Sequence, residues 1–343
     1  MLVRLGLLTI CSTACVGSGL KLESDGKTTG TPTGSIHALM TRALFDYQDH
    51  VDRVQAMRET WGTDPNMNLK FLDFGVDRFE TEYRNWCTEK ANCPLGGGYS
   101  TAESEINVPA DIVESELWNL DGHIWAMRQA LADPTCQWIL IGKDMLALHV
   151  RNLRNYLARF DSSQSLVLGN RMGMGGSNLV MASPWGHIFS RGAAQELVDN
   201  WEGGLRLREP IYNTDYLRAR GGETGYGFGH ALGHMRVPVQ FVDTRDAEGQ
   251  DRFLLWPPSR MDKGDWWDSW YPSFRIEKPK AALSPEAFLF FFAGADEIRL
   301  LSNFFEYEGE TEGFVNEHQR ATGQRMYQKT TWEMLSTLKW HNA

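Results

Sequence analysis

One apolar segment that ends in polar residues constrains the fold of this chain more than any other feature. Residues 138–141 form a continuous apolar run, typical of a buried strand, and Gly142-Lys143-Asp144-Met145 follow directly. A buried strand of an open α/β sheet presents its carboxyl-terminal residues at the edge where ligands usually bind. Asp144 offers the hard oxygen ligands that magnesium and manganese prefer, whereas Lys143 is a fixed cation and Met145 a soft thioether. The sequence therefore predicts a site with one carboxylate at this strand end.

The rest of the chain alternates between strand and helix patterns. We predict strands over residues 69–74, 137–141, 166–168 and 237–242. Helices are predicted over 111–131, with Trp118 and Trp125 on one face, over 146–157, and from the N-cap Ser190 to Val198. Strands that alternate with helices imply a mostly parallel central sheet with helices on both faces. The predicted fold class is therefore α/β.

Length and composition favour one large domain over two. The 343 residues are 42% hydrophobic and 12% aromatic, which is enough for a substantial core. The formal net charge is −10, and no clustered basic face occurs in the sequence. These properties exclude nucleic acid as a partner.

The first residues have the pattern of a targeting segment. Arg4 precedes an apolar run over residues 5–17, and small residues follow at 16–18. This run is shorter than the ~20 residues that a membrane span needs. Residues 1–18 are thus either a cleaved signal peptide or a short signal-anchor that holds the protein on a membrane. Residues 19–36 are rich in Ser, Gly and Thr and are predicted as a flexible stem. We expect the protein in the Golgi or ER lumen.

The spacing of the cysteines and histidines predicts neither a nucleophilic thiol nor a zinc site. Cys87 and Cys93 flank a short loop and either form a local disulfide, as an oxidising lumen permits, or remain two thiols. Cys136 has no histidine near it in the sequence and is predicted to be a buried thiol. His230 and His234 share a helix face, but without a third ligand or an adjacent acid such histidines are more often packing or surface residues.

Several segments, in order, resemble one enzyme family. Residues 53–62, Arg-Val-Gln-Ala-Met-Arg-Glu-Thr-Trp-Gly, resemble the basic, Thr-Trp-terminated motif of β1,3-glycosyltransferases of the fringe and core 1 galactosyltransferase group. Residues 138–157 are similar to the family's acidic-triplet strand and its next helix, and residues 166–171 to the strand after it. Segments between 242 and 301 are similar to the core 1 galactosyltransferase branch. The resemblance spans residues 53–309, with 77–108 unaligned.

This resemblance implies a GT-A-like glycosyltransferase domain over residues 37–309. Residues 310–343, beyond the resemblance, are predicted to form a C-terminal helical extension. It implies transfer of a hexose, with galactose favoured, from a UDP-sugar to a glycan or glycoprotein acceptor. The linkage would be β1,3, formed with inversion at the anomeric carbon.

The resemblance also assigns roles to individual residues. Aligned on Gly227, Glu223 takes the place of the second acid of the family's acidic pair, the general base that deprotonates the acceptor hydroxyl. A frame shifted by one residue puts Thr224 there, which cannot act as the base. The implied donor-binding residues are Arg53, Arg58, Trp61, Lys143 and Asp144, and the implied acceptor-binding residues are Trp185, Trp266, Trp270 and Tyr271. Guanidinium groups bind phosphate through paired hydrogen bonds, and aromatic rings stack on sugars. The alternative is a surface-charged helix with Trp61 capping the core and tryptophans that pack in it.

Three departures from the family affect the metal site. Lys143 and Met145 replace two acids of the triplet, and Phe291 replaces a histidine expected as a further ligand. No cofactor is firmly predicted, and manganese would depend on Asp144 alone. Two interpretations stay open: Lys143 neutralises the diphosphate in a metal-independent transferase, or the protein is a non-catalytic member that binds a glycoprotein or assists folding of an active relative. A third, a secreted carbohydrate-binding protein, requires Arg53 and Arg58 to be incidental.

Overall fold

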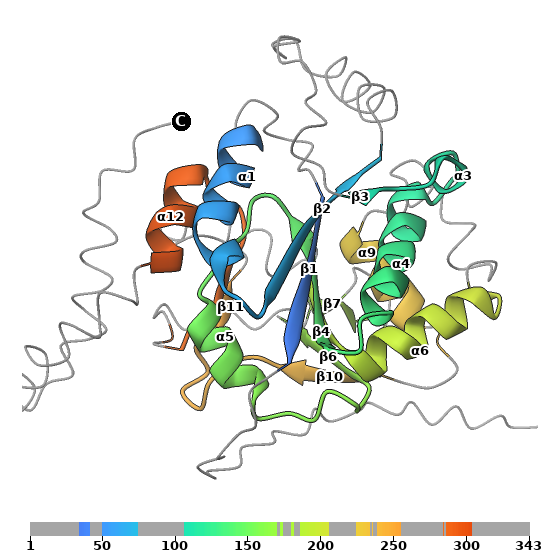
Figure 1. Ribbon diagram of the computed structural model, residues 1–343. Helices are drawn as coiled ribbons and strands as arrows, with labels where there is room; N and C mark the ends of the chain where they lie inside the picture. Colours follow the sequence, from blue (N-terminus) through green and yellow to red (C-terminus); the bar gives the residue numbers. More distant parts are fainter. Residues whose placement is uncertain are drawn as a thin grey trace, which may run out of the picture.

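The structure of the chain is a computed structural model that describes residues 34–41, 50–74, 106–169, 172–173, 180–181, 186–205, 224–233, 235, 239–254, 284 and 286–303. Its centre is a seven-stranded sheet with the strand order β10-β6-β9-β4-β1-β2-β3 (Figure 1). These strands are β1 (Ser35–Thr41), β2 (Met67–Asp73), β3 (Ile106–Asn107), β4 (Cys136–Lys143), β6 (Leu166–Gly169), β9 (His187–Ser190) and β10 (Gln240–Asp243). Only β9 runs antiparallel to its neighbours in this sheet, which confirms the mostly parallel arrangement.

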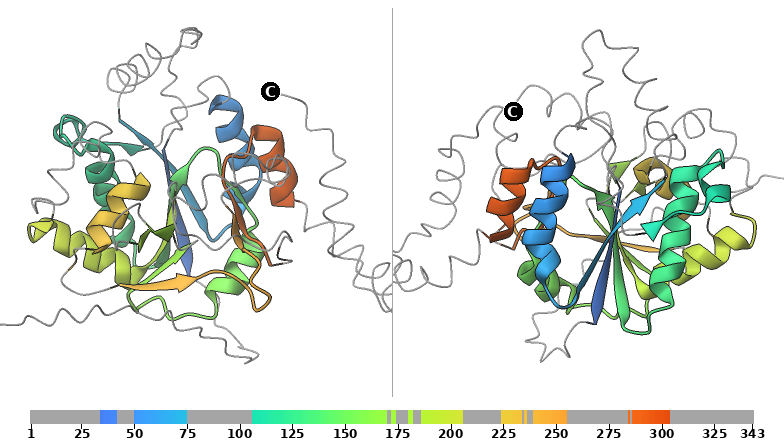
Figure 2. Two further views of the ribbon diagram at one scale, coloured as in Figure 1. Left: turned by 180° about the vertical axis from the view of Figure 1, so that it is seen from behind. Right: turned by 45° about the horizontal axis from the view of Figure 1, so that its top comes forward.

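Helices cover both faces of the sheet, as predicted (Figure 2). On one face lie α1 (His50–Glu59), α5 (Val150–Leu157) and α12 (Ala295–Asn303). On the other lie α4 (Trp118–Leu131), α6 (Arg191–Glu202) and α9 (Thr224–Gly233). The short helices η2 (Trp61–Thr63) and α3 (Ala110–Val113) precede β2 and α4. The α/β fold class is confirmed. Among the described residues, none of the helices combines the length and the apolar character needed to cross a bilayer.

The alternation of side chains along β4 explains its continuous apolar run. Trp138 and Leu140 pack in the cluster under α1 and α5, while Ile139 and Ile141 pack in the cluster under α4 and α6. Because both faces of a central parallel strand are covered, every position has to be apolar.

Small strands complete the fold. β5 (Ala147–Leu148) pairs antiparallel with β12 (Leu289–Phe290), which pairs parallel with β11 (Phe253–Leu254). β7 (Met172–Gly173) pairs with β8 (Val180–Met181).

The predicted strands correspond to β2, β4, β6 and β10, and two predicted helices need correction. The helix expected over 111–131 is interrupted between Val113 and Trp118, although Trp118 and Trp125 do pack against one apolar cluster. The helix expected over 146–157 starts only at Val150, because the preceding apolar residues pair with β12 as β5. The helix after Ser190 is longer than predicted and ends at Glu202.

The structure also shows the state of Cys136 and the start of the first strand. Cys136 is a buried free thiol, and burial raises its pKa to about 12. β1 begins at Ser35, ahead of the predicted domain start at residue 37. The leader, the stem before residue 34, Cys87, Cys93, His234 and the extension from 310 lie outside the described residues.

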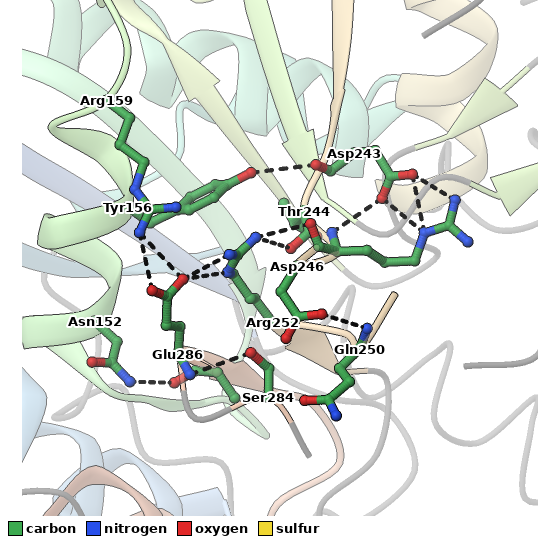
Figure 3. A network of polar contacts seen from close by, with 12 residues as sticks. Asn152, Tyr156, Arg159, Asp243, Thr244, Asp246, Gln250, Arg252, Ser284 and Glu286 are labelled. Atoms are coloured by element: carbon green, nitrogen blue, oxygen red, sulfur yellow. Dashed lines mark hydrogen bonds and ion pairs between the residues drawn. The ribbon is translucent and has the colours of Figure 1, made fainter. Parts of the chain in front are cut away.

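A polar network connects residues 243–252 and Glu286 with Tyr156 of α5 (Figure 3). Arg252 pairs with Glu286 at 2.7 Å, and its guanidinium lies 5.2 Å from the centre of the Tyr156 ring. The Tyr156 hydroxyl donates a hydrogen bond to the carbonyl oxygen of Asp243 at 3.3 Å. Since Glu286 immediately precedes the segment that contains Phe291, the network fixes where that segment lies.

Ser190 supports a test of the packing between β6 and α6. Its buried hydroxyl donates to the carbonyl oxygen of Gln164 and accepts from the amides of Leu166 at 3.0 Å and Ala193 at 3.1 Å. Ser190→Ala should lower the free energy of unfolding by about 2–3 kcal/mol, measured by urea denaturation, because it removes a helix cap and other buried hydrogen bonds. The exposed Ser163→Ala should change it by less than ~0.5 kcal/mol. Equal losses in the two variants would contradict this role of the cap.

Candidate functional site

The end of β4 lies at the edge of the sheet where the sequence places the site. Lys143 is the last residue of β4 and pairs with Thr41 at the end of the parallel strand β1. The amide of Asp144 donates a hydrogen bond to the carbonyl oxygen of Thr41 at 2.9 Å. Helix α1 begins at His50, after β1 in the chain. These segments form the carboxyl-terminal edge of the sheet, where ligands of α/β proteins usually bind.

Asp144 does not face outward from this edge but lies in a buried cluster with two residues of α1. Its carboxylate is 0% exposed, and its Oδ2 atom lies 2.6 Å from His50 Nδ1. The guanidinium of Arg53 donates to the same oxygen from Nη2 at 3.0 Å and from Nε at 3.3 Å. His50 and Arg53 are themselves buried. We call these three residues the Asp144 cluster.

Opposing effects set the charge of Asp144. Burial by itself raises the pKa of the carboxyl, but the positive charge of Arg53 and the hydrogen bonds from His50 and Arg53 outweigh it and hold the pKa below its usual value. Asp144 is therefore ionised, and the cluster pairs its charge with that of Arg53. An ionised carboxylate only accepts hydrogen bonds, so His50 Nδ1 carries the hydrogen of that contact.

Lys143 brings a second positive charge to the end of β4. Its side chain is 3% exposed and lies close enough to His123 of α4 to affect its titration. Burial and the charge of Lys143 lower the pKa of His123 to about 4. The ring of His123 lies 6.0 Å from that of Phe228 on α9, the helix that directly follows Glu223 in the chain. Lys143 thus points to the side of the sheet covered by α4 and α9.

The residues at this edge do not fit a divalent cation. The Oδ2 atom of Asp144 is engaged by His50 and Arg53, and a cation there would lie beside the Arg53 guanidinium. Met145 and Phe291 are buried apolar side chains. In the part of the chain that the structure describes, no three His, Cys, Asp or Glu side chains come together as metal ligands would. Hard cations require several oxygen ligands, which these residues do not supply.

The structure separates Arg58 from the other predicted donor residues. Helix α1 runs from the carboxyl-terminal edge toward the amino-terminal ends of the strands, where Arg58 lines a surface cavity of about 450 Å³ with Ser35 and Asp133 among others. The guanidinium of Arg58 also lies 5.4 Å from the centre of the Phe71 ring. Arg53 and Asp144 are brought together, Lys143 extends from the same strand end to the side of α4 and α9, and Arg58 lies apart from them.

Trp61 belongs to the core. Its side chain is 3% exposed, and its indole Nε1 donates a hydrogen bond to the carbonyl oxygen of Leu146 at 3.3 Å. It therefore supports the segment that follows Asp144 from inside the protein. The remaining predicted site residues lie outside the described part of the chain: Glu223, Trp185, Trp266, Trp270 and Tyr271.

His50 is the residue of this cluster that the sequence interpretation missed. It lies three residues before Arg53, so the two side chains share one face of α1. That spacing was available as a signal, but its importance depends on a carboxylate that lies 94 positions further along the chain.

Comparison with solved structures finds similarity at low sequence identity. No protein-family model and no curated protein matches it. A glycosyltransferase involved in the glycosylation of the major capsid of PBCV-1 is 11% identical, with 79% of this chain and 99% of that chain covered and a TM-score of 0.37. The galactosyltransferase LgtC, in complex with donor and acceptor sugar analogs, is 10% identical, with 80% and 99% covered and a TM-score of 0.35. An active-site mutant of LgtC gives 10%, the same coverage and a TM-score of 0.34.

The Asp144 cluster makes a prediction about stability. Asp144→Asn removes the negative charge and leaves the buried Arg53 guanidinium without its counter-ion. We expect the free energy of unfolding at pH 7 to fall by about 3–5 kcal/mol, measured by urea denaturation. Asp52→Asn, an exposed residue in the first turn of the same helix, should cost no more than ~1 kcal/mol.

The loss of stability caused by Asp144→Asn should also depend on pH. The pKa of Asp144 is lower in the folded protein than in the unfolded chain, so the charge stabilises the fold above the unfolded value of about 3.9. This contribution is lost as the pH falls through the folded pKa. The difference between wild type and Asp144→Asn should therefore be largest above about pH 5 and shrink in more acidic solution. A difference that grows toward acidic pH would show that the carboxyl is buried in its neutral form.

Proposed function

We propose that the protein is a GT-A-like β1,3-glycosyltransferase that works without a divalent metal. It transfers a hexose, with galactose favoured, from a UDP-sugar to a glycan or glycoprotein acceptor with inversion. The ordered resemblance of residues 53–309 to that family supports the sugar chemistry. The observation that carries the metal independence is the buried ion pair between Asp144 and Arg53. The leader sequence supports a place in the secretory pathway.

A fixed cation takes the place of the metal in this proposal. A UDP leaving group carries a diphosphate whose negative charge grows as its bond to the sugar breaks. The Lys143 ammonium lies at the end of β4, where the family's acidic triplet would hold the metal, and it can stabilise that charge directly. Arg53 lies at the same strand end, but Asp144 balances its charge, and its role is to hold Asp144 in place.

Glu223 supplies the base. Its carboxylate takes the proton of the acceptor hydroxyl while the hydroxyl oxygen attacks the anomeric carbon of the donor. The bond between that carbon and the diphosphate oxygen breaks, and its electron pair leaves with UDP. Attack opposite the leaving group gives inversion.

The second candidate function is that of a non-catalytic family member that binds a glycoprotein or assists folding of an active relative. The burial of Met145 and Phe291 at the positions of the missing metal ligands favours it. The two functions differ in whether the site binds a nucleotide, and this difference can be measured.

Nucleotide binding should not depend on divalent metal. We expect isothermal titration calorimetry of residues 19–343 with UDP to give the same affinity, within about twofold, in EDTA and in manganese. The reason is that the site lacks a set of hard oxygen ligands. A gain in affinity of tenfold or more with manganese would contradict the metal-independent site. Absence of binding in both buffers would favour the non-catalytic function.

Two substitutions separate donor binding from catalysis. Lys143→Met keeps the length of the side chain but removes its charge, and it should weaken UDP binding about tenfold or more because charge-assisted hydrogen bonds are lost. Glu223→Gln should lower turnover ~10²–10⁴-fold and leave UDP affinity unchanged. Arg151→Gln, which removes an exposed charge from α5, serves as the control for net charge. Retained turnover in Glu223→Gln would remove Glu223 as the base.

A further inference from the structure

The far nitrogen of His50 is the unexplained polar atom of the Asp144 cluster. His50 Nδ1 lies 2.6 Å from Asp144 Oδ2, while Nε2 is buried and finds no hydrogen-bond partner among the described residues. A buried polar atom without a partner is unfavourable, and native proteins leave few of them. A bound molecule that reaches Nε2 supplies the missing hydrogen bond.

The position of His50 distinguishes it from the other buried histidines with unpartnered nitrogens. His123 and His187 lie between the sheet and the helices α4 and α9, in contact with the Phe228 ring. Among the described residues, neither histidine contacts a carboxylate. His50 instead begins α1 at the ligand-binding edge of the sheet, and Asp144 fixes the orientation of its ring.

The contact with Asp144 determines what His50 Nε2 offers. Asp144 is ionised, so the hydrogen of the short contact is on Nδ1. In the neutral imidazole the other nitrogen then carries a lone pair and accepts a hydrogen bond. Its complement on a ligand is a hydroxyl group, which the ribose and the hexose of a sugar nucleotide both carry.

We infer that His50, oriented by Asp144, accepts a hydrogen bond at Nε2 from a sugar hydroxyl of the bound donor. This inference rests on the proposed function, because it takes the ligand to be a sugar nucleotide. His50 is a binding residue for that ligand, and Asp144 is the residue that positions it. The carboxylate that the resemblance assigns to a metal thus acts through an imidazole.

Two substitutions of His50, made in the chain from residue 19 onward, test the inference. Asn places an amide nitrogen near the position of Nδ1 and keeps the contact with Asp144, but it has no atom at Nε2. Gln places an amide oxygen near Nε2 and so keeps an acceptor for the ligand. We expect His50→Asn to weaken binding about three- to tenfold, as loss of one hydrogen bond does, and His50→Gln to restore most of the affinity.

The chain offers a matched control at the opposite edge of the sheet. His37 on β1 is also buried and also contacts a carboxylate, with Nε2 lying 3.1 Å from Asp133 Oδ2. Gln keeps an amide near Nε2 there, so His37→Gln should preserve this contact and bind the donor like wild type. Thermal unfolding of all variants shows whether an affinity change follows from a loss of stability.

Titration with UDP and with UDP-galactose distinguishes the two sugars. If the ribose donates the hydrogen bond, His50→Asn weakens binding of both ligands equally. If the hexose donates it, only UDP-galactose binding weakens. In either case, the Nε2 resonance of ¹⁵N-labelled His50 should shift when the responsible ligand is added to the wild type.

The remaining outcomes overturn the inference. Wild-type affinity of His50→Asn for both ligands would remove His50 from the donor site and leave the proposed function intact. Losses in both His50 variants that parallel their melting temperatures would assign His50 a structural role alone. If wild type binds neither UDP nor UDP-galactose, the inference and the proposed transferase fail together.

Discussion

The arrangement at the end of β4 depends on one constraint, the charge of Asp144 in a place without water. Removing an ion from water costs several kcal/mol unless a partner and hydrogen bonds compensate. Both partners of Asp144, His50 and Arg53, come from one face of α1. The ion pair therefore ties this helix to the strand end, and α12 in turn packs beside α1.

The same constraint changes the chemistry that the edge can support. A divalent cation needs several oxygen ligands that face it, and here the carboxylate of Asp144 is held by a guanidinium. The neighbouring positions are part of the packing: the amide of Ala293 donates to the carbonyl oxygen of Met145 at 3.1 Å, and the Phe291 ring lies against Gly186.

Much of the fold was predictable because its signals are local. The apolar run of β4 reflects two covered faces, and Ser190 was recognised as a cap from the residues around it. The error at the start of α5 has a different origin. Ala147 and Leu148 form a strand because they pair with Phe290 and Leu289, more than a hundred residues later, and no local pattern reports such a partner.

Individual residues of the candidate site were predictable from the sequence, but their contacts with one another were not. The sequence predicts that Arg53 and Asp144 each face a ligand. In the structure they instead form an ion pair with each other, across 91 positions of sequence. Neither can turn toward a ligand without leaving the other as an unpaired buried charge, which is far less favourable than the pair. A ligand at this edge must therefore be recognised by groups around the pair rather than by the pair itself. Two such groups are the ammonium of Lys143, on the side of α4, and the outer nitrogen of His50, on the side of α1, and they have the chemistry for a phosphate and for a hydroxyl.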